Sequence, residues 1–128
     1  MLESLFASSN YQASKLMMDV TAMRHQALAG NLANVETPGF KRMDIDPSFQ
    51  ASLKESIRAG KVEEIQQLGA PSLSEVNGLK ATRRDGNNVS LDKELMYLNQ
   101  NALDYSAMGQ FVSSSLSRLK MAITGRAQ

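Results

Sequence analysis

Residues 91–123 read LDKELMYLNQNALDYSAMGQFVSSSLSRLKMAI and carry the most regular pattern in the chain. Apolar or small residues recur in this stretch at alternating spacings of four and three, the heptad pattern of a helix that packs along one face. We call them the C-terminal seam: Leu91, Leu95, Leu98, Ala102, Tyr105, Gly109, Val112, Leu116, Leu119 and Ile123. Because the pattern continues for more than four heptads, it favours a coiled-coil helix over the core helix of a globular domain.

The predicted C-terminal helix has recognisable ends. Ser90 is a candidate N-cap, and the carboxylates of Asp92 and Glu94 complement the helix dipole in the first turn. Gly125 is a candidate C-terminal stop. A helix of about 34 residues with a rise of ~1.5 Å per residue is roughly 50 Å long.

Further apolar residues of this helix lie outside the seam. They are Met96, Leu103, Met108 and Phe111. Apolar residues on more than one side would let the helix contact several neighbouring helices. The alternative is a single partner helix within the chain, with some methionine left exposed.

A second helix is predicted over residues 12–33. Its N-terminal seam consists of Leu16, Val20, Met23 and Ala27, again at spacings of four and three. Other apolar residues, such as Met17 and Leu28, fall outside this seam, so this helix also has apolar residues on more than one side.

The middle of the chain, residues 35–89, has an irregular pattern. Asp46-Pro47 predicts the start of a short helix that Gly60 ends. Asp85-Gly86 favours a turn, and we expect a small β-hairpin around residues 79–89. The sequence therefore divides into an N-terminal helical segment (1–34), an irregular middle (35–89) and a C-terminal helix (90–128).

The composition argues against several classes of function. A formal charge of +1 and an aromatic content of 5% give little basis for nucleic-acid binding. No segment reaches the ~20 apolar residues of a membrane span, and residues 1–10 do not have the pattern of a cleaved signal peptide. There is no cysteine, so thiolate metal sites are excluded.

The chain also lacks a recognisable catalytic constellation. His25 is the single histidine, and Leu28 and Ala29 occupy the positions where a helical metal site would place further ligands. No phosphate-binding glycine loop follows a predicted strand. We therefore expect no catalytic residues, no metal and no cofactor.

Three short segments resemble one protein family. Residues 31–42, NLANVETPGFKR, resemble the signature shared by flagellar rod and hook proteins. Residues 85–92, DGNNVSLD, and residues 119–126, LKMAITGR, resemble segments of a short member of this family found in the proximal rod. The resemblance assigns an assembly motif to Asn31, Ala33, Asn34, Thr37, Pro38, Gly39, Phe40 and Lys41.

The resemblance implies both a fold and a function. The fold is all-α, with the terminal helices paired as an antiparallel coiled coil. The function is that of a structural subunit of the proximal rod of the basal body, which assembles into a hollow axial structure that transmits torque. The implied partners are copies of the chain, other rod proteins, proteins of the membrane ring and ring–rod junction, and the type III export apparatus.

The implied location is the periplasm-spanning rod, reached without a cleaved signal peptide. The alternative that keeps the helices but not the location is a soluble coiled-coil adaptor or export chaperone.

Overall fold

The computed structural model describes residues 9–81 and 83–125. The described chain contains four helices and two short strands. In order, they are α2 (Ser9–Ala33), β1 (Met43–Ile45), α3 (Pro47–Ala59), α4 (Val62–Gln67), β2 (Leu73–Glu75) and α5 (Leu91–Thr124).

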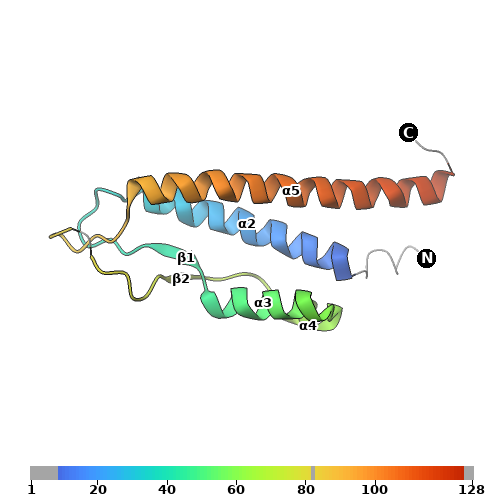
Figure 1. Ribbon diagram of the computed structural model, residues 1–128, viewed down its shortest axis with the longest axis horizontal. Coiled ribbons are helices and arrows are strands. Elements are labelled where there is room, and N and C mark those ends of the chain that lie inside the picture. The colour runs from blue at the N-terminus through green and yellow to red at the C-terminus, as the bar shows by residue number, and fades with distance from the viewer. Residues whose placement is uncertain (1–8, 82, 126–128) are drawn as a thin grey trace.

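The two long helices, α2 and α5, lie side by side and run in opposite directions (Figure 1). The all-α prediction with antiparallel terminal helices is confirmed. Helix α5 has 34 residues and begins directly after Ser90, although the Ser90 side chain makes no capping hydrogen bond. It ends at Gly125, whose φ of 64° is left-handed and whose N–H donates to the Met121 carbonyl.

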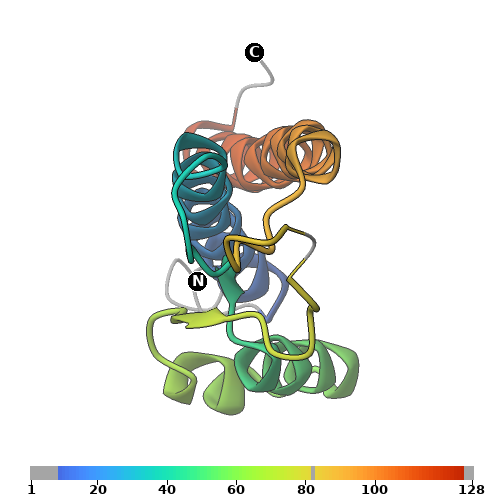
Figure 2. The same ribbon diagram turned by 90° about the vertical axis from the view of Figure 1, so that its left-hand side faces the viewer.

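The middle segment forms a lower layer against α2. Figure 2 shows α3 and α4 beneath the pair of long helices, with the strands between. The core joins Val20 of α2 to Ile45, Phe49 and Leu53. Around it pack the half-buried side chains of Leu16, Met17, Met23 and Leu68. Three residues of the N-terminal seam therefore contact the middle layer.

Local capping explains why α3 forms where it does. The Asp46 carboxylate accepts hydrogen bonds from the Ser48 and Phe49 N–H groups, at 2.8 and 3.4 Å. Hydrogen bonds from the side chain and backbone of Ser48 lower the pKa of Asp46. At the other end Gly60 is left-handed, with φ of 66°, and its N–H donates to the Ile57 carbonyl at 3.1 Å. The predicted start and stop of this helix are both confirmed.

The predicted hairpin at residues 79–89 is wrong. Among its described residues none is in a strand; the sheet instead pairs β1 with β2, antiparallel, with Ile45 opposite Leu73. The loop folds on itself because the Asn87 N–H donates to the Asp85 carboxylate at 3.0 Å and the Gly86 N–H donates to the Arg83 carbonyl at 3.2 Å. Such side-chain bonds compete with strand pairing. Helix α4 was also not predicted.

Replacing Leu53 by Ala tests the role of the lower layer. Leu53 is only 3% exposed, and removing its buried methyl groups leaves a cavity that lowers the free energy of unfolding by about 2–5 kcal/mol. Chemical denaturation followed by circular dichroism measures the change. Ser52→Ala, at an exposed position on the same helix, is the control and should leave the midpoint nearly unchanged.

Candidate assembly site

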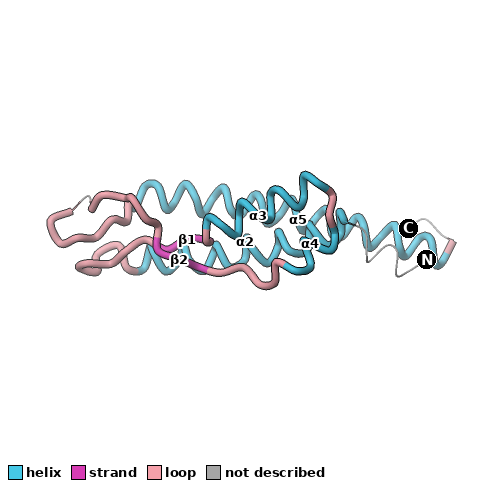
Figure 3. Tube along the Cα trace, turned by 90° about the horizontal axis from the view of Figure 1, so that it is seen from below, coloured by secondary structure: helices cyan, strands magenta, loops and turns pink. Residues whose placement is uncertain are grey.

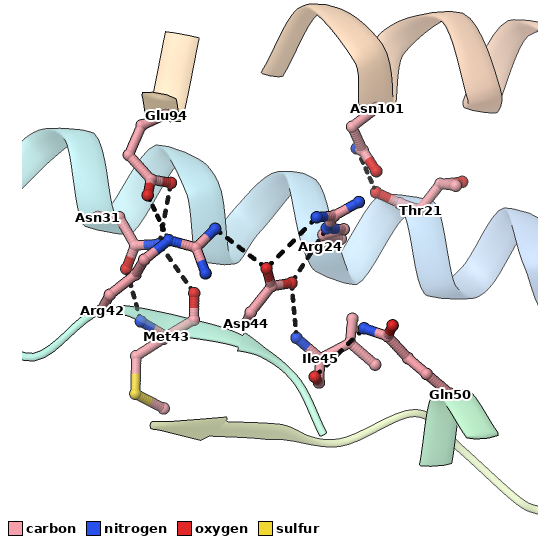
Figure 4. A network of polar contacts seen from close by, with 10 residues as sticks. All are labelled: Thr21, Arg24, Asn31, Arg42, Met43, Asp44, Ile45, Gln50, Glu94 and Asn101. Atoms are coloured by element: carbon pink, nitrogen blue, oxygen red, sulfur yellow. Dashed lines mark hydrogen bonds and ion pairs between the residues drawn. The ribbon is translucent and has the colours of Figure 1, made fainter. Parts of the chain in front are cut away.

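Asn31, near the C-terminal end of α2, connects three parts of the chain. Its side-chain amide donates to the Met43 carbonyl at 2.8 Å and to Glu94 Oε2 at 3.2 Å, and its Oδ1 accepts from the Met43 N–H at 2.9 Å (Figure 4). The side chain is fully buried. The Asn31 side chain therefore forms with Met43 the two hydrogen bonds that a neighbouring strand would form. Its bond to Glu94 connects α2 and β1 to α5.

Two arginines and two carboxylates surround this contact. Arg42 Nε donates to Glu94 Oε1, while Arg42 Nη2 lies 3.0 Å from Asp44 Oδ2 as an ion pair without hydrogen-bond geometry. Arg24 Nε donates to Asp44 Oδ1 at 3.0 Å. Both guanidinium groups lie over the Tyr97 ring, 5.7 Å from its centroid for Arg24 and 5.0 Å for Arg42. The four charges balance, which offsets the cost of burying Arg42, Asp44 and Glu94, while Arg24 is half-buried.

Arg42 is positively charged although it is buried. Burial opposes the charged form, but the hydrogen bond and the charge of Glu94, together with Asp44, outweigh it and raise the pKa of Arg42. Glu94 itself is fully buried. The pair joins the residue directly before β1 to the first turn of α5.

Asn87 closes the turn that follows α2. Its side-chain amide donates to the carbonyls of Asn34, Val35 and Thr37 at 2.9–3.1 Å, and its Oδ1 accepts from the Val89 N–H at 2.8 Å. The residue is fully buried. One side chain thus satisfies backbone carbonyls that the end of α2 leaves free.

The two motif segments meet at this turn. The Gly39 N–H donates to the Asp85 carbonyl at 2.9 Å, and Lys41 Nζ donates to the Gly86 carbonyl at 2.6 Å. Gly39 has a φ of +71°, a backbone conformation that residues other than glycine rarely adopt. A Cβ atom added at Gly86 would lie 3.7 Å from the Gly39 Cα, so the two loops pass closely.

The remaining motif residues lie around the same turn. Asn34 donates its amide to the Gly30 carbonyl at 2.8 Å and accepts from the Thr37 hydroxyl at 3.0 Å. Phe40 is half-buried, whereas Ala33 and Pro38 are exposed. The motif is brought together with residues 85–89, and its role in assembly stays a prediction.

The C-terminal seam is divided between inside and outside. Leu119 is buried, and Leu98, Gly109 and Val112 are half-buried. The exposed members are Leu91, Leu95, Ala102, Tyr105, Leu116 and Ile123. The fully buried positions of the first half of α5 are Glu94 and Asn101, whose amide donates to the Thr21 carbonyl at 2.8 Å.

A search for apolar spacing misses Glu94 and Asn101 because both are polar. The available signal was their separation of seven residues, which places them on one face of a coiled-coil helix. Arg42, the ion-pair partner of Glu94, has no such signal, since it lies beside a short strand far away in the sequence. The N-terminal seam residues Val20 and Ala27 are buried.

Sequence comparisons give the family. A protein from Aquifex aeolicus named flagellar basal body rod protein FlgB is 32% identical over 119 residues, which cover 89% of this chain and 92% of that protein. The chain belongs to the FlgB family. FlgB of Aeromonas hydrophila is 31% identical and FlgB of Escherichia coli 30%, covering 84% and 82% of this chain and 87% and 84% of those proteins. Models of known protein families give no match.

Membership of the FlgB family makes the chain a structural protein of the flagellar basal body rod and not an enzyme. Within residues 9–81 and 83–125, no helix combines the length and the apolar character required to cross a membrane. The same residues contain no group of three or more His, Cys, Asp or Glu side chains placed to hold a metal ion.

Asn87→Asp tests the closure of the turn. A carboxylate oxygen would face the three carbonyls that the Asn87 amide now satisfies, so we expect the free energy of unfolding to fall by about 1–3 kcal/mol. Hydrogen exchange should show faster opening of residues 34–40. Asn99→Asp, an exposed position on α5, should change neither measurement.

Glu94→Ala tests the buried ion pair. Removing one partner leaves Arg42 with Asp44 alone and should destabilise the fold by about 3–5 kcal/mol. A double-mutant cycle with Arg42→Met, measured by urea denaturation, separates the pair from other effects. Strictly additive losses would contradict a direct coupling between the two side chains.

Proposed function

We propose that the chain is a subunit of the proximal rod, where copies assemble through their terminal helices into a hollow axial structure that transmits torque. Its neighbours in this proposal are further copies, other rod proteins and the proteins that join the rod to the membrane ring. The subunit reaches the rod through the flagellar type III export apparatus and not by a cleaved signal. In this proposal residues 1–34 and 90–128 form the coiled-coil core and residues 35–89 a supporting segment.

The observation that carries the proposal is the apolar surface of α5. Among the described residues, the exposed large apolar side chains on this helix are Leu91, Leu95, Met96, Leu103, Tyr105, Phe111, Leu116, Met121 and Ile123. Leu103 is 72% exposed and Ile123 63%. Apolar side chains concentrated on one helix favour association, because burying them removes that surface from water.

The position of this surface supports assembly over a purely internal role. The C-terminal part of α5 extends beyond the described N-terminal end of α2 (Figures 1 and 3). Of the polar contacts described between α5 and the rest of the chain, those made by Glu94, Tyr97 and Asn101 all lie in its first half. The first half is thus anchored, and the second half, in which Leu119 is buried, carries exposed apolar side chains that in this proposal contact neighbouring subunits.

Gly109→Leu separates assembly from folding. A Cβ atom at Gly109 meets no atom within 4 Å, and replacing a helical glycine removes its cost of about 1 kcal/mol, so the isolated chain should be at least as stable. In the rod, the larger side chain should block close packing and abolish motility. The measurements are thermal unfolding, swimming, and recovery of the chain with purified basal bodies.

Gly109→Ala is the graded control and should lose less motility. Normal swimming by the Gly109→Leu strain would contradict a close contact at this position. Recovery of the unaltered chain from the cytoplasm alone, and not from basal bodies, would support the adaptor or chaperone alternative.

A further inference from the structure

The segment that follows β2 contains the one Asn-Gly pair of the sequence, Asn77-Gly78. In such a pair the backbone nitrogen of the glycine can attack the side-chain amide carbon of the asparagine, because glycine has no Cβ atom to hinder the approach and its backbone rotates freely. In a folded chain the reaction requires an accessible asparagine side chain and a glycine N–H without a hydrogen-bond partner. The structure meets both requirements.

Asn77 and Gly78 are both exposed. Gly78 has a left-handed backbone, with φ of +82°, and a Cβ atom added to it would meet no atom within 4 Å. Within residues 9–81 and 83–125, no group forms a hydrogen bond with the Asn77 side chain or with the Gly78 N–H. The two reacting groups are therefore open to water and are not held apart by other contacts.

The chain is tied down just before this pair and not at it. The Val76 N–H donates to the Arg42 carbonyl at 2.9 Å. After it, the described residues between β2 and α5 form no helix or strand. Exposed loops of this kind rearrange at little cost in free energy, so the Gly78 nitrogen can reach the side-chain carbon of Asn77.

We propose that Asn77 is a site of spontaneous deamidation. The Gly78 nitrogen forms a bond to Asn77 Cγ and gives up its proton, while the Cγ–Nδ2 bond breaks and the nitrogen leaves as ammonia. The product is a five-membered succinimide ring. Water then opens the ring at one of its two carbonyl groups, which gives either an aspartyl or an isoaspartyl residue at position 77. Overall, one water is consumed and one ammonia is released, with no oxidation or reduction.

Asp85-Gly86 is the second place where a glycine follows a residue of this side-chain length, and there the structure opposes the reaction. The Gly86 N–H donates to the Arg83 carbonyl at 3.2 Å, and Asp85 Oδ1 accepts from the Asn87 N–H at 3.0 Å. Ring closure at this pair would break both hydrogen bonds. We therefore expect reaction at position 77 and protection at position 85.

Deamidation changes the surface of the protein and leaves the core intact. The new carboxylate adds one negative charge, which takes the formal net charge from +1 to zero. The charge appears two residues after Glu75, an exposed carboxylate of β2. The isoaspartyl form also adds one carbon to the backbone path of the exposed segment. The proposal goes beyond the proposed function and does not depend on it, because the reaction needs only the folded chain and water.

The sequence provides a convenient measurement. Trypsin cuts after Lys61 and Lys80 and releases residues 62–80, in which Asn77 is the single asparagine. The purified folded chain is incubated at neutral pH, sampled over time, digested and analysed by mass spectrometry, with a sample digested at the start to correct for change during digestion. We expect the peptide to gain the mass difference between an amide and an acid and to separate into two products. Isoaspartyl methyltransferase should label one of them.

A synthetic peptide of residues 62–80 gives the rate without any protection by the fold, and the folded chain should react at a comparable rate. Asn77→Gln is the matched control: it keeps an exposed amide, but ring closure would need a less favourable six-membered ring, so the mass should not change. Residues 85–93 form a second tryptic peptide and should gain isoaspartate only when the chain is unfolded in urea. Retention of the Asn77 amide in the folded chain, while the synthetic peptide loses it, would overturn the proposal.

Discussion

The buried ion pair between Arg42 and Glu94 determines where α5 lies against the rest of the chain. Glu94 is fully buried. A shift of α5 by one residue would separate Glu94 from Arg42 and leave an unpaired charge inside the protein, at a cost of several kcal/mol. Asn31 and Asp44 complete the pairing. Buried polar groups of this kind specify one alignment of two helices where apolar contacts alone would tolerate several.

This constraint divides α5 into two parts with different tasks. The first half is held to α2 and β1 by Glu94, Tyr97 and Asn101. The second half carries exposed apolar side chains, among them Phe111 and Ile123. The described polar contacts therefore hold α5 at its first half, while the second half, apart from the buried Leu119, carries the exposed apolar side chains that we propose contact neighbouring subunits.

How much of the candidate site could be predicted depends on how far apart in the sequence the interacting residues lie. The motif around Pro38 and Gly39 could be recognised because it is contiguous, and its loop does meet residues 85–89. The contact that the motif makes with α5 could not be predicted, because Asn31 and Glu94 are 63 positions apart in the sequence. The role of the apolar seam of α5 in assembly stays a prediction, and within the molecule the polar Glu94 and Asn101 are the fully buried positions in the first half of this helix.

Local rules of the chain were sufficient for α2, α3 and α5 and for the ends of α3 and α5, but not for α4 or the two strands. Heptad spacing gave the long helices, Asp46 and Gly60 gave the ends of α3, and Gly125 gave the end of α5, because capping and periodicity involve residues within one or two helical turns. The three-dimensional arrangement decided the pairing of β1 with β2, the loop conformation of residues 83–89 and the face of α5 that turns inward. Those features depend on hydrogen bonds and ion pairs between residues far apart in the chain, which no local pattern records.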